Sequence, residues 1–219
     1  MPNPIDSLRF VHAAIVAEVD DLESAIQGAS GPAEAGELTE RIDYFGRLVN
    51  SHTSGEEVGL FPRLIERDET YAETYLFDHV EERKLFAELV ELARACEGGS
   101  DDALERLRRE IVVLSTHAHA HIAKENELVL PRVASLFSPE EQGQIVGQIL
   151  STFTPEETAA AVPWIIARLD ADVAAAYVNV LANVMPPPAF EAAKGWIQGG
   201  ISAEQWRALT ERAPVLAAG

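Results

Sequence analysis

The sequence predicts an all-α protein that begins with a four-helix bundle. Apolar residues recur at helical spacing through most of the 219 residues, and stretches that alternate like a β-strand are nearly absent. Four long periodic segments are separated by short segments rich in Gly, Ser or Pro, as expected for helices joined by short loops. We therefore expect an up-down-up-down bundle in residues 1–137, followed by a C-terminal extension of short helices in residues 138–219.

The first helix is predicted over residues 5–26. Its apolar side chains form one stripe, and His12 lies beside that stripe. Residues 28–36 contain Ser, Gly and Pro and are predicted to form a loop. The second helix starts near Glu37, and Pro62 is expected to kink or end it, because proline lacks the N–H that a helix interior requires.

The third helix is predicted from about Thr70 to Cys96 and carries His79 among its inward side chains. The Gly-Gly-Ser sequence at 98–100 breaks the chain after it. The fourth helix is predicted over residues 101–137. Each of the four helices therefore carries at least one histidine on or beside its apolar stripe.

Residues 138–219 show three clear helix starts. In each, a Ser or Thr is followed three residues later by Glu or Gln, which is the pattern of a capping box, and the three begin at Ser138, Thr154 and Ser202. This region contains no histidine, so no ligand set is visible in it. We expect it to pack on the bundle, where it would cover a site or offer a surface to a partner.

The composition argues against several kinds of partner and site. The formal net charge of −19 argues against nucleic acid and anionic membranes as partners, because both attract clustered Lys and Arg. The single cysteine, Cys96, cannot form an internal disulfide and excludes a thiolate-rich zinc or iron–sulfur site. No apolar run approaches the roughly 18 residues of a membrane span. Together these features predict a cytoplasmic protein.

Two copies of one motif point to metal chemistry. His52 and Glu56 are four residues apart, as are His121 and Glu125, and each copy reaches a proline ten residues after its histidine. Residues four apart lie on one face of a helix, so the imidazole and the carboxylate of each pair can converge on one metal ion.

The predicted ligand set draws on all four helices of the bundle. Its members are His12, His52, Glu56, His79, His121 and Glu125. Helix bundles are known to hold two metal ions with histidine and carboxylate ligands. Donors of this kind without cysteine favour iron over manganese or zinc.

The ligand count predicts a reactive centre. If both glutamates bridge two iron ions, the six residues and one bridging oxo or hydroxo group leave one open position on each octahedral iron. An open position suits a small oxidant, whereas a structural metal is normally closed to further ligands.

These residues resemble the ligand order of hemerythrin-like (HHE cation-binding) domains, over about residues 5–137. A narrower resemblance, to the hemerythrin domains of BRUTUS-type iron-sensing plant ubiquitin ligases, rests on residues 75–86, 137–142 and 162–164 and extends to about residue 170. No RING or other zinc module is visible in the sequence, so ligase function is not implied.

The resemblance implies a non-haem di-iron protein that reacts with O2, peroxide or nitric oxide in sensing or detoxification. Oxygen-carrying hemerythrins are similar, but they have a histidine where this chain has Arg83 and an aspartate at a different spacing where it has Glu125. Reversible O2 carriage is therefore not the expected function. Two alternatives remain open: a di-iron oxygenase of a small-molecule substrate, and an iron-responsive protein-interaction module.

Four further residues are candidates for an additional ligand or for a partner that orients one. His117 lies one turn before His121. Tyr44 and Tyr75 precede ligand histidines by two turns and one turn, although a packed core role with a tethered hydroxyl is favoured for both. Glu57 can accept a hydrogen bond from a ligand histidine, or it can lie on a solvated helix face.

Overall fold

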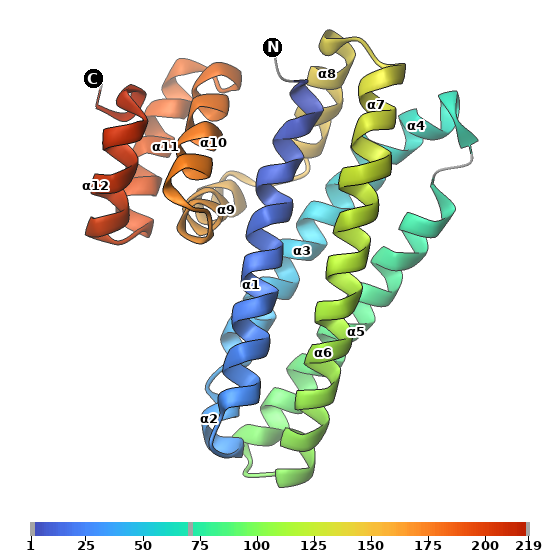
Figure 1. The fold of residues 1–219 in the computed structure, drawn as a ribbon, viewed down its shortest axis with the longest axis vertical. Coiled ribbons are helices and arrows are strands. Elements are labelled where there is room, and N and C mark those ends of the chain that lie inside the picture. Colours follow the sequence, from blue (N-terminus) through green and yellow to red (C-terminus); the bar gives the residue numbers. More distant parts are fainter. Residues whose placement is uncertain (1–2, 70–71, 218–219) are drawn as a thin grey trace. The chain divides into compact units, whose positions relative to one another are not determined.

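The structure is a computed structural model that describes residues 3–69 and 72–217. These residues form helices and turns with no strand, which confirms the all-α prediction. The long helices in Figure 1 are α1 (Leu8–Gly28), α3 (Thr39–Gly59), α5 (Glu73–Glu97) and α6 (Asp101–Lys124). The shorter helices are α2 (Pro32–Gly36), α4 (Phe61–Arg67), α7 (Leu130–Leu136), α8 (Pro139–Leu150), α9 (Pro155–Arg168), α10 (Ala171–Val184), α11 (Pro187–Gly200) and α12 (Ala203–Arg212). None of the helices formed by the described residues has the length and apolar character that crossing a bilayer requires.

The chain divides into two compact units, which are described separately. One unit is formed by residues 18–152, and the other by residues 1–17 together with 153–219. Helix α1 runs through both, because it continues without a break past Ala17. Helix α8 is grouped with residues 18–152. The division into domains after residue 137 stays a prediction.

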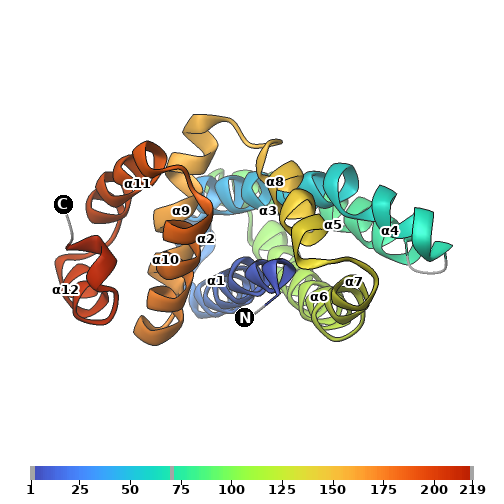
Figure 2. The same cartoon turned by 90° about the horizontal axis from the view of Figure 1, so that it is seen from above.

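The unit of residues 18–152 is built on three neighbouring long helices. Helix α5 packs against both α3 and α6 (Figures 1 and 2). The second half of α1 joins them through an ion pair between Glu18 and Arg41 of α3 and a hydrogen bond from the Gln27 side chain to the Arg108 carbonyl of α6. The interior is filled by large aliphatic and aromatic side chains with almost no exposed surface, among them Ile42, Phe45, Leu89, Leu107 and Ile111.

Two predicted elements differ in the structure, and one predicted helix start falls outside the described residues. Residues 28–36 were predicted as a loop, but Pro32 starts the short helix α2, where proline suits the first helical position. Thr70, the predicted start of the third helix, lies outside the described residues, and α5 begins at Glu73. The predicted fourth helix is divided, because the π-helical turn Glu125–Val129 separates α6 from α7.

The other unit has its own apolar core. Helices α9 to α12 contribute most of it, and Ala14 of α1 is one of its buried members. Phe10 and Val11 pack against the same core, so the first half of α1 is part of this unit. The predicted capping boxes at Ser138, Thr154 and Ser202 are all confirmed, and the last two start α9 and α12 of this unit.

Candidate metal centre

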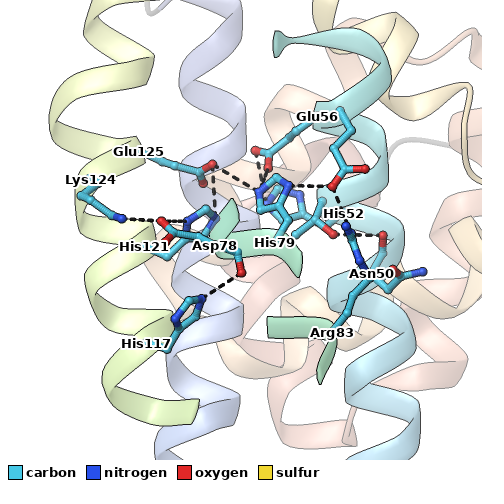
Figure 3. A network of polar contacts seen from close by, with 12 residues as sticks. Asn50, His52, Glu56, Asp78, His79, Arg83, His117, His121, Lys124 and Glu125 are labelled. Carbon is cyan, nitrogen blue, oxygen red and sulfur yellow. Dashed lines mark hydrogen bonds and ion pairs between the residues drawn. The ribbon is translucent and has the colours of Figure 1, made fainter. Parts of the chain in front are cut away.

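A cluster of buried imidazoles and carboxylates lies inside the unit of residues 18–152. It is formed by Glu56 of α3, His79 of α5, His121 of α6 and Glu125 at the start of the π turn. All four residues are at most 4% exposed. Each offers one ligand atom, and the four atoms lie within 4.8 Å of one another (Figure 3).

The separations of the ligand atoms suit a shared metal ion. The Nε2 atom of His121 is 3.4 Å from a Glu125 carboxylate oxygen, and the Nε2 atom of His79 is 3.6 Å from Glu56 and 3.9 Å from Glu125. Two ligand atoms that are each about 2.1 Å from one ion are about 3 Å apart at a right angle and about 4.2 Å apart at opposite positions. The observed values fall within this interval, and they are long for direct hydrogen bonds.

A second set of ligand atoms shares both glutamates with the first. Three of its residues are His52, Glu56 and Glu125, whose ligand atoms lie within 4.8 Å of one another. The Nε2 atom of His52 is 3.5 Å from a carboxylate oxygen of Glu56. Each glutamate can therefore serve two neighbouring ions. His12, the remaining predicted ligand, is buried on the part of α1 that belongs to the other unit, and its ligand role stays a prediction.

The outer nitrogens of two histidines contact further carboxylates. The Nδ1 atom of His79 is 3.0 Å from Glu57, which also accepts a hydrogen bond from Arg83. The Nδ1 atom of His121 is 3.3 Å from Asp78, which forms an ion pair with Lys124. Glu57 is one of the candidates predicted from the sequence, whereas Asp78 is not, although Asp78 directly precedes His79.

Two of the other sequence candidates, His117 and Tyr75, lie beside the cluster. His117 is 3.1 Å from the backbone carbonyl of Asp78, and its ring stacks on that of His121. The buried ring of Tyr75 lies 6.2 Å from the ring of His121 and 5.7 Å from that of Phe61. Tyr44 is half-buried, and its ring lies beneath the guanidinium of Arg47.

The electrostatic environment concentrates negative charge in the interior. Burial acts to lower the pKa of His79, but Glu125, Glu56 and Glu57 outweigh it and raise that pKa above its ordinary value. Burial lowers the pKa of His121. Burial, with contributions from the Glu125 and Glu56 charges, raises the pKa of Glu82 to about 7.

The residues present fit a metal cation. Buried carboxylates need compensating positive charge, and a cation placed among these carboxylates and imidazoles would supply it. Nitrogen and oxygen donors without sulfur suit iron, and they also suit manganese and zinc. The arrangement can therefore hold one metal ion between α3, α5 and α6 and can share both glutamates with a second.

Comparisons with known proteins support a metal-binding role. Residues 3–137 match the family model of the hemerythrin HHE cation-binding domain. The chain is 30% identical over 146 residues to the Arabidopsis thaliana protein named "Zinc finger protein BRUTUS". That alignment covers 66% of this chain but 12% of the relative, so the chain corresponds to a small part of that protein. No solved structure matches the chain.

Proposed function

We infer a metal-dependent function from the fact that this chain belongs to the hemerythrin HHE cation-binding domain family. We propose that it is a non-haem di-iron protein that reacts with O2, peroxide or nitric oxide, in oxidant or iron sensing or in detoxification. The observation that carries this proposal is the pair of buried glutamates shared by two sets of ligand atoms. The lone cysteine favours a reducing compartment, and we propose the cytoplasm.

In this proposal six residues bind two iron ions on the long helices α1, α3, α5 and α6, arranged as an up-down-up-down bundle. His12 and His52 would hold one ion, His79 and His121 would hold the other, and Glu56 and Glu125 would be shared by both. Bound iron would supply one-electron redox chemistry and an open coordination position for a small oxidant.

The protein's own side chains restrict what reaches the centre. His52, His79 and His121 are at most 6% exposed, and both glutamates are at most 1% exposed. Phe61 and Tyr75 add apolar rings beside His79 and His121. A centre enclosed in this way favours a diatomic or similarly small reactant, which supports O2, peroxide or nitric oxide over a bulky oxygenase substrate.

One observation favours a second candidate, an iron-responsive interaction module. The predicted ligand His12 lies on the same two turns of α1 as Phe10, Val11 and Ala14. These three residues pack in the core of the unit formed by residues 1–17 and 153–219. Metal binding at His12 would therefore stabilise a helix on which that unit depends. Limited proteolysis of residues 153–219 with and without iron tests this function, and identical digestion in both states would exclude it.

Metal analysis combined with an ultraviolet–visible spectrum tests the first proposal. We expect two iron ions per chain and, in the oxidised protein, an oxo-to-iron charge-transfer absorption in the near ultraviolet. This absorption should be absent from the reduced protein and appear when peroxide, a two-electron oxidant, converts both ferrous ions to ferric ions. Protein that holds at most one tightly bound metal ion per chain would contradict the di-iron proposal.

A further inference from the structure

Two candidate ligand histidines of the centre, His79 and His121, each contact a carboxylate through the Nδ1 atom, which is the ring nitrogen that does not face the cluster. The first set, called here the Asp78 triad, consists of His121, Asp78 and Lys124. The second set, the Glu57 triad, consists of His79, Glu57 and Arg83. In each triad a carboxylate contacts the Nδ1 atom of a ligand histidine and also pairs with a partly exposed cation.

Asp78 makes three contacts with α6 (Figure 3). Its side chain contacts the Nδ1 atom of His121 at 3.3 Å and pairs with Lys124, and its backbone carbonyl lies 3.1 Å from the Nε2 atom of His117. These three residues of α6 extend over about two helical turns. The contacts therefore fix both the position of α6 along α5 and the rotation of the His121 ring.

The triads also determine which ring nitrogen carries the proton. An ionised carboxylate paired with Lys or Arg can only accept hydrogen bonds. The Nδ1 atom must then donate, and in a neutral imidazole the Nε2 atom keeps its lone pair. In both histidines the Nε2 atom is the one that faces the cluster carboxylates.

We propose that Asp78 is a positioning residue that holds His121 as the Nδ1–H tautomer with Nε2 toward the centre before any metal binds. Glu57 has the same role for His79. Lys124 and Arg83 hold the two carboxylates in place from the surface side. This inference rests on the proposed function for the identity of the metal, but the tautomer and the ring orientation are properties of the metal-free protein.

Nuclear magnetic resonance of the imidazole nitrogens in the full-length, metal-free protein tests the proposal directly. Spectra are recorded at alkaline pH, where the rings are neutral. We expect both His121 and His79 to be Nδ1–H tautomers. Observation of His121 as the Nε2–H tautomer in the unmodified protein would overturn the proposal, and this measurement needs no variant that has to fold.

Substitutions then assign each ring to its carboxylate. Asp78→Ala should shift His121 toward the Nε2–H tautomer and leave His79 unchanged, and Glu57→Ala should have the opposite effect. Asp78→Asn keeps a carbonyl oxygen that accepts from Nδ1–H, so it should largely retain the original tautomer of His121. An unchanged His121 tautomer in Asp78→Ala would show that the carboxylate does not position the ring.

The matched control is Glu88→Gln. Glu88 of α5 pairs with Arg106 of α6 at 3.0 Å, so this substitution also removes an ion pair between the same two helices, but at an exposed place. It should leave both tautomers unchanged. If Glu88→Gln changed them as much as Asp78→Ala does, the effect would be general loosening of α5 against α6 and the proposal would fail.

Measuring metal affinity beside the tautomers distinguishes the positioning role of Asp78 from the proposed di-iron function. Asp78→Ala should weaken metal binding by about 10- to 100-fold, as is typical when the partner of a ligand histidine is removed, and Asp78→Asn should weaken it less. Correct tautomers in a protein that binds no iron would refute the proposed function and leave the positioning role standing. Two bound iron ions with His121 as the wrong tautomer would do the reverse.

Discussion

The two His-x-x-x-Glu segments place their candidate ligands in the same way but continue differently after the glutamate. Helix α3 ends at Gly59, three residues after Glu56, and α4 starts at Phe61. Helix α6 instead passes into a π turn that begins at Glu125 and leads directly into α7. Each segment must accommodate a proline ten residues after its histidine, and the two segments do so in different ways.

In the first segment the helix is interrupted and another helix supplies a hydrogen bond. Pro62 has no N–H to donate to the carbonyl of Val58, four residues earlier. That carbonyl accepts a hydrogen bond of 3.4 Å from the Gln148 side chain of α8. Helix α8 comes close because Gly55 and Gly59 have no side chains, and Ile149 occupies the space beside them.

In the second segment the backbone widens instead. The N–H of Leu130 bonds to the carbonyl of Glu125, five residues back, so the turn is one residue wider than an α-helical turn. Pro131 is then accommodated at the start of α7. The ligand spacing therefore depends only on the four residues from His to Glu, and the path that follows is set by neighbouring helices.

The largest expected effect is on metal binding, and it comes from replacing the glutamate at the end of either His-x-x-x-Glu segment. Glu56→Gln and Glu125→Gln should each weaken binding of both metal ions by more than about 100-fold, because each carboxylate would serve two ions in the proposed centre and partners of ligands alone account for 10- to 100-fold. Metal content per chain is the measurement. Glu127→Gln, in the same π turn but exposed, is the control and should keep both ions.

A smaller effect is expected from Glu82, a buried carboxyl that senses the charges of both glutamates. Its pKa is about 7 in the folded, metal-free chain, against 4.5 ordinarily. Between these pH values the unfolded chain releases the proton and the folded chain keeps it, so stability falls as pH rises, by about 3 kcal/mol in total.

Glu82→Gln cannot ionise and should lose this pH dependence. Denaturant unfolding of metal-free protein across that pH range measures the difference between variant and original. Glu81→Gln, one residue away and partly exposed, is the control. If the stability difference between Glu82→Gln and the original protein did not grow with pH, the buried carboxyl would be ionised in the folded chain.

The close contact of α3 with α8 predicts that adding a side chain at Gly59, in the first segment, lowers the free energy of unfolding. A Cβ atom at Gly59 would lie 2.9 Å from the backbone nitrogen of Ile149, so Gly59→Ala should destabilise the protein by about 1–3 kcal/mol. A Cβ atom at Gly147 of α8 meets nothing within 4 Å, and Gly147→Ala should stabilise by about 0.5–1 kcal/mol. Thermal or denaturant unfolding measures both, and equal effects would show that α8 does not pack this closely.

The smallest expected effect on stability comes from the hydrogen bond between the Gln148 side chain and the Val58 carbonyl, which has no counterpart described in the second segment. Gln148→Ala removes the donor to the Val58 carbonyl, and water can replace it because Val58 is exposed. We expect a loss of about 0.5 kcal/mol in the free energy of unfolding. A loss above that of Gly59→Ala would mean that Gln148 matters for more than this carbonyl.

The long helices and the spacing of the candidate ligands could be predicted from the sequence, because both depend on contacts between residues a few positions apart. The choice between an interruption at Gly59 and a π turn at Glu125 could not. Both segments carry the same proline, and the α- and π-helical hydrogen bonds differ by one residue.

Asp78 was missed for a different reason. Its partners His117, His121 and Lys124 are on another helix, and which of them it meets depends on how far α5 is shifted along α6. Glu57 was easier to name because it directly follows a ligand glutamate. Its actual contact is with His79 of α5, which again depends on helix packing.

The path of α1 through both units affects the order in which the protein can fold. Phe10, Val11 and Ala14 leave the ribosome well before α9 to α12, the helices that cover them. The unit of residues 18–152 is complete in the nascent chain long before that moment. Assembly of the other unit therefore has to wait until residues 153–219 have been made, and the start of α1 lacks these neighbours in the meantime.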